Sequence, residues 1–162
     1  MNDELGARYY RLALCVASRR DLSGAALYAW YACILDPQRT DAVFLLGLCL
    51  YELGYPDAQR YFPAGFPAPA GEECAAMEEG LRRVRDLAAR KKWKAAARAA
   101  EALPHQSVRA LNIQGCLFAL AERYTKAADC FAMAREKDRG SGLAQAGLEE
   151  TLRRRKRLWG LL

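Results

Sequence analysis

The sequence is poor in the residues that build catalytic and metal sites. Its 162 residues include a single histidine, His105, and none of the six cysteines forms a CxxC pair. The chain therefore offers too few ligands for a zinc site of Cys and His. A Ser/His triad likewise lacks partners for the single histidine. No phosphate-binding loop and no dinucleotide-binding glycine motif is present. We expect a protein that is not an enzyme and that uses no metal and no cofactor.

Long apolar runs are missing as well. No segment approaches the roughly 18 consecutive apolar residues of a membrane helix, and the first residues lack the basic, apolar and cleavage regions of a signal peptide. We therefore expect a cytoplasmic location and no membrane span. The cysteines fall within apolar helical patterns, which predicts reduced, buried thiols rather than disulfides. They are Cys15, Cys33, Cys49, Cys74, Cys116 and Cys130.

The chain contains no stretch that alternates well enough to predict a strand, and its apolar residues follow helical spacing. Two segments carry a glycine among bulky residues. Gly47 and Gly115 are 68 residues apart, twice 34, and one period of 34 before Gly47 lies Ala13. A 34-residue period of paired helices is the tetratricopeptide signature.

The chain resembles the tetratricopeptide family over nearly its whole length, through large and small residues that recur in phase. The first unit offers Tyr9, Leu12, Ala13, Val16, Ala25, Ala29, Ala32 and Pro37. The last full unit offers Leu111, Gln114, Gly115, Phe118, Tyr124, Ala127, Phe131 and Ala134. A third unit is weak and contains Leu87, Trp93, Ala96 and Ala100.

This resemblance implies an all-α, right-handed solenoid of helical hairpins in a single domain. Small residues let the two helices of a unit approach, and large residues fill the space between units. The units are expected at approximately 6–39, 40–70, 71–105 and 106–140. A capping helix is expected at 141–160.

The proline-rich segment 63–70 interrupts the second unit. Pro63 directly follows Phe62, so the second helix of that unit is expected to stop there. The segment contains Phe66 between prolines. Three interpretations remain open for it: a plug that covers the core of the shortened helix, a contact site for a partner, or a disordered loop.

The family resemblance also implies where a partner binds, because tetratricopeptide proteins use the concave face lined by the first helix of each unit. The residues expected there form a largely apolar groove suited to an amphipathic helix or an extended peptide. Alternatively, they complete the core or pack under the C-terminal helix. They are Tyr10, Leu14, Phe44, Leu48, Tyr51 and Asn112.

Charge divides the chain into two unlike halves. Residues 1–81 hold 6 Lys/Arg and 11 Asp/Glu, whereas residues 82–162 hold 19 and 8. Two basic clusters are candidates for contact with nucleic acid, anionic lipid or an acidic protein. Alternatively, the first cluster is a solvated turn and the second belongs to a charged capping helix. They are Arg90, Lys91, Lys92 and Lys94 in one cluster, and Arg153, Arg154, Arg155, Lys156 and Arg157 in the other.

These observations predict a protein–protein interaction module: an adaptor, a scaffold or a chaperone-like holder of a peptide segment. One alternative is nucleic-acid or anionic-surface binding through the basic C-terminal half. Another rests on a similarity to the small bacterial tetratricopeptide chaperones of type III secretion, which have about three units. A homo-oligomer, in which the acidic half of one copy meets the basic half of another, is a third possibility.

Overall fold

The protein is described from a computed structural model, which places residues 2–61, 73–103 and 107–160. These ranges are helical and contain no strand. The proline-rich segment 63–70, Phe62 and His105 lie outside the described residues. The elements are α1 Asn2–Ser18, α2 Leu22–Leu35, α3 Thr40–Glu52, the 3-10 helix η1 Pro56–Tyr61, α4 Glu73–Ala89, α5 Trp93–Glu101, α6 Val108–Leu120, α7 Tyr124–Lys137 and α8 Gly142–Leu158.

Four helix–helix turns share one backbone conformation. A single residue in each has positive φ: Arg20 at 60°, Gly54 at 85°, Lys91 at 56° and Glu122 at 60°. The next N–H in each turn donates to a carbonyl five residues back, as from Asp21 to Val16 at 3.3 Å. This is the Schellman motif, which ends a helix by satisfying its last carbonyls. Arg20, Gly54 and Glu122 are spaced by 34 and 68 residues, so the period of the sequence is also a period of the backbone.

The helix starts repeat in the same way. Ser107 accepts a hydrogen bond from the N–H of Ala110 at 3.1 Å, and Ser141 accepts one from Ala144 at 3.3 Å. These two N-caps are 34 residues apart and begin α6 and α8. Asp21 caps α2 similarly through the N–H of Gly24. Such caps satisfy N–H groups that lack an intrahelical partner.

Each of the four ranges expected to form a unit contains two helical segments. The second unit is shortened, because a six-residue 3-10 helix stands where the other hairpins have an α-helix. Within the last hairpin, a Cβ atom added to Gly115 would lie 2.9 Å from the ring of Phe131. The small residue therefore permits the close approach of α6 and α7.

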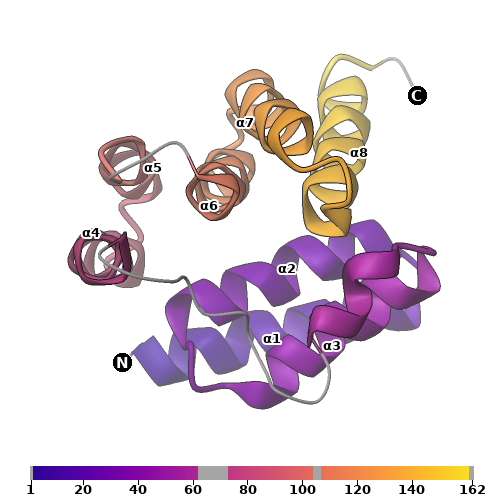
Figure 1. The fold of residues 1–162 in the computed structure, drawn as a ribbon, viewed down its shortest axis with the longest axis horizontal. Helices are drawn as coiled ribbons and strands as arrows, with labels where there is room; N and C mark the ends of the chain where they lie inside the picture. The colour runs from indigo at the N-terminus through magenta and orange to yellow at the C-terminus, as the bar shows by residue number, and fades with distance from the viewer. Residues whose placement is uncertain (1, 62–72, 104–106, 161–162) are drawn as a thin grey trace.

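Figure 1 shows α4 to α8 following one another along an arc, with α1 to α3 grouped below it. Within the lower group, α2 is the helix that faces the arc. It contacts α1 and α3 on one side and α4, α6 and α8 on the other. Its sequence LSGAALYAWYACIL contains no charged residue, and its residues from Gly24 onward are almost all buried. A helix that is apolar on every side belongs in the centre of a core.

The expectation of buried cysteines holds in part. Cys33, Cys49 and Cys116 are buried free thiols, Cys130 is half-buried, and the side chain of Cys74 lies outside the described residues. Cys15 is exposed, so the expectation was wrong for this residue. The physical reason is that α1 is packed on one side only, and Cys15 falls on its uncovered side.

Candidate protein-binding face

The repeated turn gives a common register for the first helix of each hairpin. Three positions lie ten, six and three residues before the residue with positive φ, and we call them the inner positions. The register of α8 follows from its N-cap, because Ser141 lies 34 residues after Ser107, the N-cap of α6. The inner positions are Tyr10, Leu14 and Ala17 on α1; Phe44, Leu48 and Tyr51 on α3; Leu81, Arg85 and Ala88 on α4; Asn112, Cys116 and Ala119 on α6; and Ala146, Glu150 and Arg153 on α8.

On α6 the inner positions are covered by α2. The indole Nε1 of Trp30 donates to the backbone carbonyl of Asn112 at 3.2 Å. The thiol of Cys116 donates to the carbonyl of Leu27 at 3.7 Å. Asn112, Cys116 and Ala119 are all buried. Desolvation in this contact raises the pKa of the Cys116 thiol well above its ordinary value.

On α4 the same positions meet the other end of α2. Arg85 donates from Nε to the carbonyl of Ile34 at 2.8 Å, next to the last residue of the helix. A cation at this end also complements the negative end of the helix dipole. Leu81 and Ala88 are buried beside it. The inner positions of α4 and α6 thus hold the body and the C-terminal end of α2.

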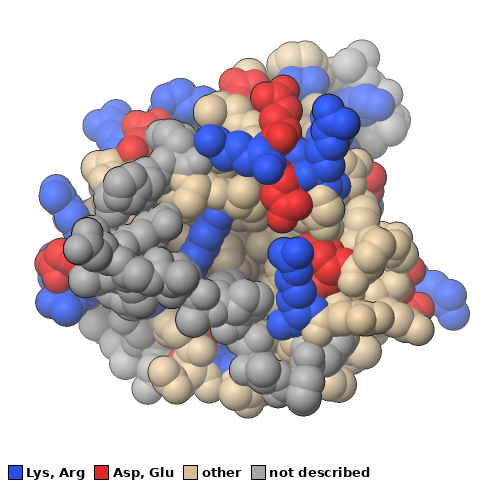
Figure 2. Space-filling model, in the orientation of Figure 1, with Lys and Arg blue, Asp and Glu red and all other residues tan. Residues whose placement is uncertain are grey.

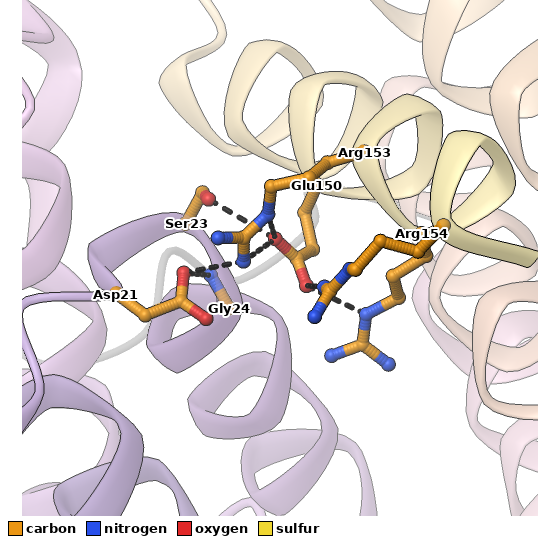
Figure 3. Close-up of polar contacts among 7 residues, drawn as sticks. Asp21, Ser23, Gly24, Glu150, Arg153 and Arg154 are labelled. Atoms are coloured by element: carbon orange, nitrogen blue, oxygen red, sulfur yellow. Dashed lines mark hydrogen bonds and ion pairs between the residues drawn. The ribbon is translucent and has the colours of Figure 1, made fainter. Parts of the chain in front are cut away.

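The inner positions of α8 hold the start of α2 through charge. Figure 3 shows the carboxylate of Glu150 between two arginines of its own helix. Arg154 Nε lies 2.6 Å from Glu150 Oε1, and Arg153 bonds the other carboxylate oxygen. The same guanidinium of Arg153 reaches Asp21 Oδ1 at 2.6 Å. Ser23 donates to Glu150 at 3.2 Å, so two residues at the start of α2 join the cluster.

Glu150 is buried although it is charged, with its side chain only 1% exposed. A buried carboxylate is tolerated when cations and hydrogen-bond donors surround it. The cations also shift the titration of a neighbouring acid. Burial opposes the ionisation of Asp21, but the hydrogen bonds from Arg153 and the Gly24 N–H outweigh it, and the pKa of Asp21 lies below its ordinary value.

On α1 and α3 the inner positions are exposed instead. Leu14, Leu48 and Tyr51 are 43%, 39% and 61% exposed, Phe44 is exposed too, and Tyr10 is half-buried. α1 and α3 contact each other, and Tyr10 and Leu14 precede Phe44 and Leu48 by one period of 34 residues. These five residues therefore form one apolar surface, which we call the α1–α3 face. Five of the six residues expected to line a groove lie on it.

The sixth residue, Asn112, lies elsewhere. It is 4% exposed and sits beneath Trp30 on the covered face of α6. The structure therefore separates Asn112 from the exposed apolar residues and assigns it to the core. The sequence period places Asn112 in register with Phe44 but does not reveal that α2 covers only one of the two positions.

The two basic clusters are also separated. Arg90, Lys91, Lys92 and Lys94 are exposed at the turn between α4 and α5. Arg153 and Arg154 on α8 are drawn inward by Glu150, whereas Lys156 and Arg157 are exposed. On the side of the molecule shown in Figure 2, Lys and Arg side chains alternate with Asp and Glu side chains over α7 and α8.

A cavity of about 510 Å³ adjoins the ion cluster between the start of α2 and the end of α8. Asp21, Glu150 and Arg154 line it, and their charges are already matched within the protein. Tyr28 forms another wall, with the guanidinium of Arg154 5.0 Å from its ring centre. In the described ranges no three His, Cys, Asp or Glu side chains form a group that could hold a metal ion.

Sequence reasoning missed the roles of Asp21 and Glu150. The available signal was the composition of α2, whose lack of any charged residue predicts a helix enclosed on all sides. Such a helix needs covering partners beyond its own hairpin, and α4, α6 and α8 supply them. Glu150 itself gave no signal, because an acidic residue beside an arginine-rich run also fits a solvated helix surface.

Comparisons of the chain with protein-family models, with curated proteins and with solved structures found no match. Within the described residues, no helix is both long enough and apolar enough to span a bilayer.

Proposed function

We propose that this chain is a tetratricopeptide-type solenoid that binds an apolar helix of a partner protein on its α1–α3 face. One observation carries the proposal. The inner positions of α4, α6 and α8 hold a helix, α2, whereas the same positions of α1 and α3 carry large apolar side chains that are exposed. The chain thereby contains an example of the contact that its open face can make.

The chemistry of the partner follows from α2. Alanines let this helix approach its neighbours closely, and Trp30 and Leu27 fill the space against α6. A partner helix of the same kind would cover Leu14, Leu48 and Tyr51 with apolar side chains. A helix laid in an apolar groove is a recurring mode of peptide recognition. Apolar burial supplies the driving force, so binding should depend little on salt.

The placement of the basic residues favours this proposal over nucleic-acid binding. Three of the five cations in the α8 cluster, Arg153, Arg154 and Arg157, already pair with Glu150 or Asp21 within the protein. The other cluster lies at the α4–α5 turn, which is at the opposite end of the arc from α8 in Figure 1. Phosphate backbones are bound by continuous arrays of unpaired cations, and these two clusters do not form one.

A labelled peptide tests the proposal. The probe is a fluorescent synthetic helix with the sequence of residues 21–36 and Cys33→Ser, and its binding is followed by anisotropy. Leu14→Glu places a charge on the α1–α3 face and should weaken binding by about tenfold or more, as expected for a central interface residue. Met133→Glu on α7 is the matched control, because Met133 and Leu14 are both 43% exposed. Equal binding by the two folded variants would contradict the proposal.

A further inference from the structure

A second group of exposed apolar side chains lies at the end of α8. Leu158 and Trp159 are 65% and 63% exposed. They directly follow three cations, Arg155, Lys156 and Arg157, and the guanidinium of Arg155 lies 5.5 Å from the ring centre of Trp159. We call Arg155–Trp159 the α8 end. It combines an aromatic anchor, an aliphatic side chain and a net positive charge.

The α1–α3 face has the complementary character on its α3 side. Phe44, Leu48 and Tyr51 lie between two exposed acidic residues: Asp41, whose carboxylate lies 3.6 Å from Arg39 Nη1, and Glu52 at the end of the helix. α3 contains no Lys or Arg. A partner that offers apolar side chains next to cations therefore suits this surface better than an uncharged one, because charge complementarity adds specificity and speeds encounter.

Within one chain the two surfaces do not cover each other, since both remain exposed. The anchoring of α8 explains the separation. The N–H of Gly142 donates to Asp57 Oδ2 at 3.0 Å, which fixes the start of α8 beside η1, directly after α3. At 1.5 Å per residue, the remaining length of α8 carries its last turn about 20 Å or more away from this point. Contact between the two surfaces therefore requires two copies.

We propose that the α8 end of one copy docks on the α1–α3 face of a second copy. This inference rests on the proposed function, because it names an occupant for the same face. Trp159 packs against Leu48 and Tyr51, and Lys156 lies near Glu52. The contact is heterologous, because it joins the α8 end of one copy to a different surface of the next. An open assembly therefore always keeps one free α1–α3 face and one free α8 end. The assembly therefore grows with protein concentration unless it closes into a ring.

Sedimentation velocity of paired variants tests this arrangement. Wild-type protein should show an average sedimentation coefficient that rises with concentration and falls with added salt. Leu48→Glu removes the acceptor surface and Trp159→Glu removes the docking end, so each variant alone should remain a monomer at concentrations where wild type associates. Mixed together, the two variants still hold one intact face and one intact end. They should form a one-to-one pair that grows no further.

Met133→Glu serves as the control and should associate as wild type does, and circular dichroism checks the fold of every variant. The inference is overturned if wild type stays monomeric at all concentrations, if either variant alone associates as wild type does, or if the mixed variants form no pair. Binding of the residue 21–36 peptide to Trp159→Glu separates the two proposals. A variant that binds this peptide while wild type stays monomeric would retain the proposed function and remove only the self-association. Pairing of the mixed variants without peptide binding would retain the self-association and contradict the binding of an apolar partner helix.

Discussion

Leu48 on α3 and Cys116 on α6 occupy the same inner position 68 residues apart, yet Cys116 is fully buried and Leu48 is 39% exposed. The difference lies in what faces each residue. The Cys116 thiol meets the carbonyl of Leu27 on α2, whereas no helix among the described residues covers Leu48 in this way. One chain thus contains both an occupied and an open form of the same helical face, and this contrast is the basis of the proposed function.

The buried Glu150 is expected to hold the two groups of helices together. Glu150→Ala leaves Arg154 without its carboxylate and Arg153 with Asp21 alone, and it removes the acceptor for Ser23. Because both arginines are partly exposed and can turn to water, we expect a loss of about 1–3 kcal/mol rather than the full cost of breaking a buried pair. The midpoint of urea unfolding measures this loss.

The neighbouring Glu149 supplies the control for that experiment. It is exposed, and its carboxylate accepts from Gln145 of the same helix at 2.9 Å and from the Tyr55 hydroxyl at 3.4 Å. Glu149→Ala should change the free energy of unfolding by no more than about 0.5 kcal/mol, as surface substitutions do. Equal effects at positions 149 and 150 would show that the ion cluster does not stabilise the fold.

Asp21 should make stability depend on pH on the acidic side. Its pKa is lower in the folded protein, so the folded state binds its proton less readily than the unfolded chain. Its contribution is therefore complete above the unfolded value of about 3.9 and is lost as the pH falls through the lower folded pKa. Asp21→Asn keeps a good N-cap but removes the charge. The variant should show a weaker fall in stability below about pH 4.

The exposed Asp129 on α7 provides the comparison for this pH series. Asp129→Asn removes one exposed carboxylate outside the ion cluster, so unfolding midpoints measured at each pH compare the loss of a charge at the two positions. An Asp21→Asn curve parallel to that of wild type would contradict the ion pair between Asp21 and Arg153 in solution.

Gly115 tests the close packing of the last hairpin. A Cβ at this position would lie 2.9 Å from the ring of Phe131, which is itself fully buried. Gly115→Ala should therefore lower the free energy of unfolding by about 1–3 kcal/mol through overpacking, even though alanine favours the helix. Gly140→Ala in the exposed turn before α8 is the control. A Gly115→Ala protein as stable as wild type would mean that α6 and α7 do not approach this closely.

The helical hairpins were predictable because their determinants are local. Gly47 and Gly115 mark the period of 34, and the turns at Arg20, Gly54 and Glu122 follow the same spacing in the structure. Leu14, Leu48 and Tyr51 lie on α1 and α3 and are exposed, and their contact with a partner stays a prediction. Local spacing fixes which residues share a helix face.

The burial of Asn112 and the role of Glu150 were not predictable from that period. Both depend on α2 lying against α4, α6 and α8, which are far from it in sequence. A repeat pattern describes how each helix packs on its neighbours, but it does not state whether the chain closes upon itself. The shortened second hairpin, ending in η1, adds a further departure from the regular repeat.

Site-specific photo-crosslinking tests the central claim most directly. Tyr51 is replaced by the photoreactive amino acid benzoylphenylalanine, which keeps an aromatic ring on the α1–α3 face, and the same residue replaces Met133 on α7 in a control protein. Each protein is irradiated with the residue 21–36 peptide and analysed by mass spectrometry. The account predicts a peptide adduct at position 51 and none at position 133. An adduct at 133 but not at 51, or none at either position, would contradict it.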